Sequence, residues 1–251
     1  MSVRKALPPA TVQSLYNDWV RQVAQDLDDP RKDRNETVIT VAEDLLPWAY
    51  KARGIPGKVM SAQLDPRNIT LEAEYYGEMD PERFYRVKPL LWLWRLFDMS
   101  PQGQNVHLGL LFRAMLAKRI FKHCGEEVRI FEGVTVSFGY NISCADRVSI
   151  HRNVLIDDRG DVLIGREASL SDYVNIYSHD HSPLDIRDVS IKPTVIGEGA
   201  RLTYHSTVLA RRVLEPDSMV GCLGVVTRDI NESHIAVGVP AKAVRVKERP
   251  G

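Results

Sequence analysis

Two histidines flank one aspartate in the stretch VNIYSHDHSPLD, which spans residues 174–185. A neutral imidazole can take a proton from a reacting hydroxyl at neutral pH, so His179 and His181 are candidates for a general base. A His-x-His pair can also bind one metal ion, and a polar run of this kind is common at the tip of a solvated loop. The elements that lead into the stretch must decide between these three interpretations.

From Val128 onward the chain follows a six-residue apolar repeat, with two extra residues inserted near Phe138-Gly139 and near Arg159-Gly160. In each of fourteen units the first residue is followed two places later by an apolar residue, at Ile130, Val136, Cys144, Ile150, Ile156, Ile164, Leu170, Ile176, Ile196, Leu202, Val208, Leu214, Val220 and Val226. A helix would need a period near 3.6, and a β-sandwich has longer, irregular turn spacing. The repeat therefore predicts a β-helix, in which three hexads form one triangular coil and the third residue of each hexad points inward. The two insertions are predicted corner bulges that use glycine.

The first half of the chain has a helical pattern instead. It predicts an amphipathic helix from Val12 to Leu27, a weaker one from Val41 to Arg53, one that begins at Pro81 and runs toward Pro89, and one from Asn105 to His123. We therefore expect a mainly β chain with a helical N-terminal extension (1–72), a helical subdomain (73–127) and a β-helix (128–247) that carries a histidine loop at 177–193.

Composition excludes several classes of protein. The 33 basic and 33 acidic residues cancel, so the net charge gives no sign of a nucleic-acid partner. The most apolar short run, LLWLWRLF, has eight residues and contains Arg95, whereas a membrane-spanning helix needs about 20 apolar residues. The three cysteines form no CxxC motif, and the first residues lack the apolar stretch of a signal peptide. We expect a cytoplasmic protein with no membrane span and no structural zinc.

Several of these segments resemble the maltose, galactoside and nodulation O-acetyltransferases. The resemblance covers about residues 73–247 and rests on YYGEMDPERFYR, GYNISCADRVSIHRNVLIDD, VLIG, VNIYSHDHSPLD and GVVTRDINESHIAVGVPAKAVR. It implies a left-handed parallel β-helix and a homotrimer with active sites between neighbouring subunits. It also implies an enzyme, an acyltransferase that moves an acetyl or similar group from acetyl-CoA to a hydroxyl of a sugar-like or other small acceptor.

The resemblance also separates the two histidines. In the family the catalytic histidine follows its strand in the pattern I-x-x-x-x-H, which from Ile176 gives His181 as the general base and leaves His179 as its neighbour. Metal catalysis of the kind found in gamma-class carbonic anhydrases needs another spacing. Here 28 residues separate His151 from His179, and 24 separate His181 from His205. We therefore expect no metal.

The family's acceptor and cofactor positions carry over residue by residue. His151 stands where the sugar acetyltransferases have an asparagine that contacts the acceptor, and Asp157 or Asp158 takes the place of the acidic contact. The residues expected to contact CoA are Tyr204, Cys222, Thr227, Arg228, Lys242 and Arg245.

One feature favours a second function. Tyr204 replaces a small residue on the path of the pantetheine arm, and Arg201 replaces an aromatic or apolar one, so the channel could be narrowed. The alternative is a β-helix binding or scaffold protein that does not use CoA in the usual way.

Overall fold

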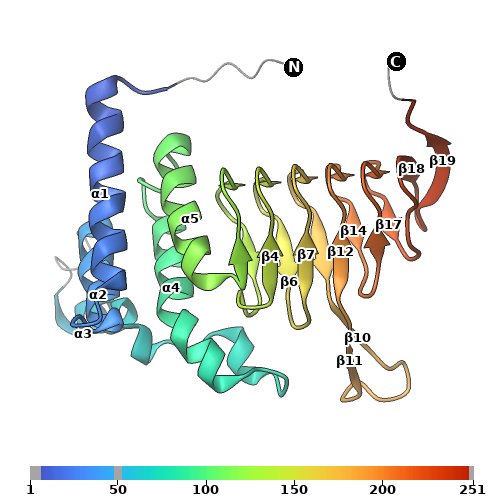
Figure 1. Ribbon diagram of the computed structural model, residues 1–251. Coiled ribbons are helices and arrows are strands. Elements are labelled where there is room, and N and C mark those ends of the chain that lie inside the picture. Colours follow the sequence, from blue (N-terminus) through green and yellow to red (C-terminus); the bar gives the residue numbers. More distant parts are fainter. Residues whose placement is uncertain (1–6, 48–52, 249–251) are drawn as a thin grey trace. The chain divides into compact units, whose positions relative to one another are not determined.

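The computed structural model describes residues 7–47 and 53–248. The chain divides into two compact units, one formed by Met1–Leu71 with Lys88–Arg119 and the other by Glu72–Val87 with Ile120–Gly251. The domain boundaries expected near residues 72 and 127 stay predictions. The first unit is helical and the second contains the strands (Figure 1).

The helices of the first unit form where the sequence places apolar stripes and caps. They are α1 (Ala10–Asp28), α2 (Arg34–Leu45), α3 (Gly54–Leu64), η2 (Pro66–Asn68) and α5 (Val106–Ile120), together with most of α4 (Pro81–Met99), while η3 (Glu72–Tyr75) and the start of α4 belong to the second unit. The predicted helices at Val12–Leu27 and Asn105–His123 are confirmed by α1 and α5. No helix in the described ranges, 7–47 and 53–248, is long and apolar enough to cross a membrane.

Two other helix predictions were wrong in extent. The weak helix expected from Val41 to Arg53 begins earlier, as α2, because the Asp33 side chain accepts hydrogen bonds from the first backbone N–H groups and caps it. It ends at Leu45, and part of the predicted span, residues 48–52, lies outside the described residues. The helix that begins at Pro81 does not stop near Pro89 but continues to Met99. The apolar residues after Pro89 are buried along it, and their packing outweighs the proline.

The second unit is a parallel β-helix made of three sheets. Sheet A has the strand order β1-β4-β7-β12-β15, and sheet C has the order β17-β14-β9-β6-β3. Sheet B has the order β19-β18-β16-β13-β8-β5-β2. The strands are β1 (His123–Cys124), β2 (Arg129–Ile130), β3 (Thr135–Val136), β4 (Ile142–Cys144), β5 (Ser149–Ile150), β6 (Leu155–Asp157), β7 (Val162–Ile164), β8 (Ser169–Leu170), β9 (Asn175–Tyr177), β12 (Thr194–Ile196), β13 (Arg201–Leu202), β14 (Thr207–Val208), β15 (Val213–Leu214), β16 (Met219–Val220) and β17 (Val225–Val226). At the C-terminal end β16 pairs with β18 (His234–Val237), and β19 (Lys242–Val246) adds antiparallel to β18.

The core of this unit consists of the inward residues that the repeat predicts. Thirteen of the fourteen are buried, and Val136 is half-buried. Successive coils stack in register, so that Ile150 pairs with Leu170 in one column of sheet B and Ile156 pairs with Ile176 in sheet C. Each coil therefore buries its apolar side chains against the coils above and below it.

The two predicted corner bulges use their glycines differently. Gly139 has φ of +77°, the left-handed conformation that favours glycine. Gly160 is needed for space instead, because a Cβ atom there would come within 2.6 Å of the Ile191 side chain and 3.0 Å of the Ser178 carbonyl oxygen. Only the first bulge thus has the conformational reason expected from the sequence.

Two edges of the coil matter for the site. The segments that lead from sheet C to sheet A (137–141, 157–161, 177–193, 209–212 and 227–229) form the C–A edge. Those that lead from sheet B to sheet C (131–134, 151–154, 171–174, 203–206 and 221–224) form the B–C edge. The longest of these segments is the histidine loop, which extends beyond the coil as a hairpin (Figure 1).

Candidate active site

The histidine loop is a β-hairpin, not a plain loop tip. Strand β10 (His179–His181) pairs antiparallel with β11 (Val189–Ile191). Side chains alternate along a strand, so His179 and His181 lie on the same side of β10. The Asp180 carboxylate between them accepts a hydrogen bond of 3.0 Å from Arg211 in the next coil. The spacing of the HDH motif thus brings its two imidazoles together and directs its carboxylate to another partner.

His181 has the geometry of a base whose tautomer is fixed. Its Nδ1 lies 2.6 Å from the Ile186 carbonyl oxygen. Because a carbonyl only accepts, Nδ1 must carry the proton in this contact, and Nε2 of the neutral ring keeps its lone pair. The side chain is exposed at the pocket, so Nε2 is accessible to a reacting group.

His179 lies deeper and faces a carboxylate. Its side chain is 12% exposed, and its Nδ1 is 3.0 Å from Oδ2 of Asp157. Among the described residues Nδ1 of His179 has no hydrogen-bond partner, so the N–H geometry toward Asp157 is unsuited to a hydrogen bond. The contact between the two side chains is therefore electrostatic. The other carboxylate oxygen of Asp157 accepts from the Arg159 backbone N–H at 3.3 Å. The rings of His179 and His181 are almost perpendicular, with centroids 5.1 Å apart.

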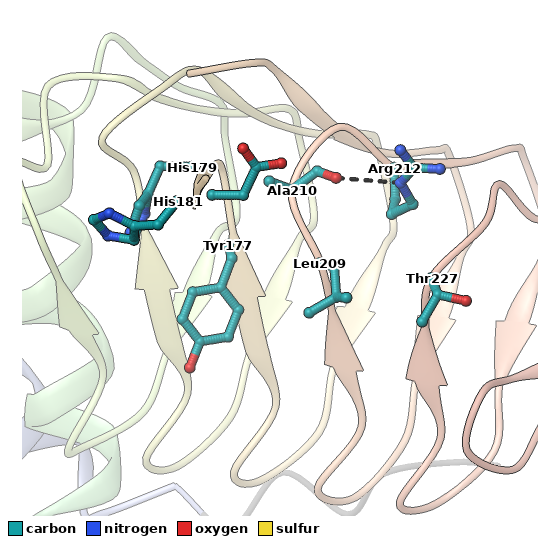
Figure 2. A pocket seen from close by; sticks show the side chains of 8 residues that line it. Tyr177, His179, His181, Leu209, Ala210, Arg212 and Thr227 are labelled. Atoms are coloured by element: carbon teal, nitrogen blue, oxygen red, sulfur yellow. Dashed lines mark hydrogen bonds between the residues drawn. The ribbon is translucent and has the colours of Figure 1, made fainter. Parts of the chain in front are cut away.

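Both histidines line a pocket of about 380 Å³ on the C–A edge (Figure 2). Its wall follows sheet C from coil to coil, because Tyr177, Leu209 and Thr227 each come directly after the inward residue of a sheet C strand. The remaining lining residues are Asp180, Ala210 and Arg212. Sequence reasoning found Thr227 but missed Tyr177, Leu209, Ala210 and Arg212. Aligning the hexads by coil would have placed Tyr177 and Leu209 in line with Thr227.

A second feature that sequence reasoning missed is a buried ion pair near His179. The Arg159 guanidinium lies 2.7 Å from Glu78, and its side chain is 6% exposed. It also stacks over the Tyr76 ring at 4.3 Å. Burial alone would raise the pKa of Glu78. Hydrogen bonds from its own backbone and from Arg159, together with electrostatic interaction with Arg159 and His179, hold that pKa below its usual value. The segment before α4 is thereby fixed to the second coil.

Asp157 and Asp158, predicted to bind an acceptor, both lie at this corner. Asp158 is fully buried, and its carboxylate accepts hydrogen bonds from the backbone N–H groups of Phe138, Gly139 and Asn141. Burial raises its pKa to about 6 in spite of these bonds. Asp158 therefore holds the bulge of the preceding coil, and contact of either carboxylate with an acceptor stays a prediction.

Three of the predicted residues lie on the other edge. His151, Tyr204 and Cys222 belong to the B–C edge, in the second, fourth and fifth coils. The His151 ring stacks on Phe131 with centroids 4.8 Å apart, and burial lowers the pKa of His151. The Tyr204 ring is 47% exposed and stands edge-on to its neighbour His205. One chain by itself does not bring these residues to His181.

The remaining predicted cofactor residues divide between two places. Thr227 and Arg228 lie on the C–A edge, next to the pocket, whereas Lys242 and Arg245 are exposed on β19. All four are accessible. No group of three or more His, Cys, Asp or Glu side chains within residues 7–47 and 53–248 could hold a metal ion.

Known proteins share both the sequence pattern and the fold. No protein-family model matches the chain. The galactoside O-acetyltransferase of Escherichia coli K12 is 26% identical over 138 residues, 53% of this chain and 68% of its own length. A crystal structure of a galactoside acetyltransferase in complex with coenzyme A is 26% identical, with a TM-score of 0.54 over 66% of this chain and 81% of that one. A maltose O-acetyltransferase of Clostridium difficile 630 has 21% identity and a TM-score of 0.58 over 72% of this chain and 99% of that one.

These similarities define the class of the protein. The fold is the left-handed β-helix of the hexapeptide-repeat acetyltransferases, as the sequence predicted. The resemblance to the maltose and galactoside O-acetyltransferases is confirmed, and the chain is an acyltransferase.

Proposed function

We propose that the protein transfers an acetyl or similar acyl group from acyl-CoA to a hydroxyl of a small acceptor, with His181 as the general base. The observation that supports this most directly is the bond from His181 Nδ1 to the Ile186 carbonyl, which leaves Nε2 as a proton acceptor at the pocket. The relatives named as acetyltransferases, one of them solved with coenzyme A, support the donor.

In the proposed reaction His181 removes the proton from the acceptor hydroxyl as its oxygen attacks the thioester carbonyl carbon. A hydroxyl is a weak nucleophile until its proton is removed, and a placed base contributes about 10²–10⁴-fold in rate. The carbon–sulfur bond then breaks, and the protonated His181 returns the same proton to the departing thiolate. The histidine ends neutral and ready for another cycle.

The CoA donor fits the residues along the C–A edge. Arg212 and Thr227 line the pocket next to the histidines, and Arg228 is exposed beside them. We propose that Thr227, Arg228, Lys242 and Arg245 bind the donor, the cations through its phosphates. The phosphates of an acyl-CoA carry several negative charges. These exposed cations would pair with them without the desolvation cost of a buried ion pair.

We further propose a homotrimer in which the B–C edge of one copy faces the pocket of the next. The separation of His151, Tyr204 and Cys222 from His181 on different edges of one coil supports this arrangement. A three-fold association that joins the B–C edge of one copy to the C–A edge of the next would complete the site. Sedimentation of the purified protein tests it, since a monomer with full activity would contradict the proposal.

A scaffold without chemistry is the second candidate, and Tyr204 is the observation that favours it. Its half-exposed ring occupies the B–C edge next to exposed Leu223, where a pantetheine arm would need small side chains. Titration calorimetry of acetyl-CoA into wild type, His181→Ala and Tyr204→Ala separates the two. Binding by wild type and by His181→Ala, with acetyl transfer lost only in the latter, supports the enzyme. Binding that appears only in Tyr204→Ala supports the scaffold.

A matched control is His123→Ala, which removes an exposed histidine from the first coil. It should keep the full acetyl transfer rate. If its rate falls as far as that of His181→Ala, the assignment of the base to His181 is wrong.

A further inference from the structure

Asp157 and His179 have no role in the transfer as proposed, yet their arrangement is costly for the fold. A nearly buried imidazole nitrogen faces a carboxylate at 3.0 Å without an aligned hydrogen bond. Leaving a buried polar atom without a hydrogen bond destabilises a protein, so such a contact at a pocket suggests a task. The ring of the same histidine stands edge-on to His181.

We propose that Asp157 and His179 form a positioning pair for His181: the pair fixes the His181 ring at the pocket and sets the local charge that the ring meets when it takes a proton. This inference rests on the proposed function and deepens it. It changes the expected role of Asp157 from binding the acceptor to orienting a histidine.

The hairpin is held to the coil from both sides of β10. On one side of β10, Asp180 is bound by Arg211 of the following coil. On the opposite side of β10, His179 reaches back to Asp157 of the preceding coil, and Asp157 is itself fixed by a backbone N–H of its own corner. The hairpin is therefore tied to the coils before and after it, and His181 lies between the two ties, with its ring against His179.

Most of the charged groups around His181 belong to ion pairs. Three charged groups near it have partners of opposite sign that cancel most of their field, namely Glu78 with Arg159, Asp180 with Arg211 and Arg212 with Asp229. Asp157 has only His179 as an ion-pair partner in the described part of the chain. Asp188 on the same hairpin is exposed, so solvent screens its charge, whereas the Asp157–His179 pair is nearly buried and its charge is screened little.

The test uses NMR titration of the histidine rings in full-length, isotope-labelled wild type, His179→Asn and Asp157→Asn. Asparagine at 179 keeps an N–H donor toward Asp157 but removes the ring that can carry a positive charge opposite this carboxylate. The His181 titration curve should move to higher pH in this variant and to lower pH in Asp157→Asn, by about half a pH unit each. Asp185→Asn, which alters an exposed carboxylate at the hairpin tip, should leave the curve in place.

Activity gives an independent readout. His179→Ala should lower kcat for acetyl transfer about ten-fold with little change in KM for acetyl-CoA, and His179→Asn should recover part of kcat because it keeps the tie to Asp157. Unchanged His181 titration curves in both pair variants would overturn the proposal, whatever the activity. Absence of acetyl transfer by wild type would refute the proposed function instead, while the titration curves would still decide on the pair.

Discussion

Asp158 gives the most quantitative prediction. Its carboxylate is fully buried, and burial raises its pKa from 3.8 to about 6 although three backbone N–H groups point at it. The perturbation is Asp158→Asn, which keeps the shape and one acceptor oxygen but has no proton to lose. The free energy of unfolding of wild type and variant should then depend differently on pH.

The size of the difference follows from linkage. A carboxyl whose pKa is higher in the folded than in the unfolded state binds its proton more tightly when folded, so its stabilising contribution is complete below the unfolded pKa and is lost as the pH rises through the folded pKa. A shift of about two pKa units corresponds to about 3 kcal/mol. The stability of wild type minus that of the variant should therefore fall by about 2.5 kcal/mol between pH 4 and pH 7, the part of the full effect that lies above the unfolded pKa.

Urea unfolding at fixed protein concentration, followed by circular dichroism at several pH values in this range, measures the difference. Other titrating groups are shared by both proteins and cancel in the subtraction. A difference that is constant with pH would refute the reasoning, because it would mean that the three N–H groups fully offset the burial of the charge. A difference that grows with pH would mean that they more than offset it.

Three further outcomes follow from packing. Gly197→Ala should lower the free energy of unfolding in urea by about 1–3 kcal/mol, because the added Cβ would come within 2.6 Å of a backbone oxygen in the next coil. The control Gly77→Ala should leave the free energy of unfolding unchanged, because a Cβ there meets nothing within 4 Å. Leu170→Ala, in the inward column of sheet B, should cost about 2–5 kcal/mol in the same assay, and a smaller loss would argue against a tightly packed coil. Arg113→Met should cost about 3–5 kcal/mol by removing the buried guanidinium that pairs with the Asp98 carboxylate, and an unchanged melting temperature would contradict this.

The β-helix could be predicted in detail because its contacts repeat. Each inward residue packs on the same position of the next coil, so a periodic sequence is enough to name the core, as it did for Ile150 and Leu170. The helical half has no such repeat. There the end of a helix depends on whether burial outweighs a local signal, and the residues after Pro89 show that it does.

The site was predictable only where it follows the same period. The register of the hexads led to His181, and the HDH spacing placed His179 beside it. The partners of these residues could not be read in this way. Asp157 reaches His179 across a whole coil, and Arg159 meets Glu78 from a segment 81 residues away. No local pattern encodes such pairs, because they depend on how the chain returns to the same corner.

The coil continues past the histidine hairpin as though the hairpin were absent. Val162 pairs with Thr194, and Asn175 pairs with Thr207, in the same register as in the coils without an insertion. The strand stacking of the scaffold therefore does not depend on the hairpin. Exchanging it for a hairpin of another sequence would give a new reactive surface on an unchanged frame, so chemistry and stability can evolve, or be engineered, separately.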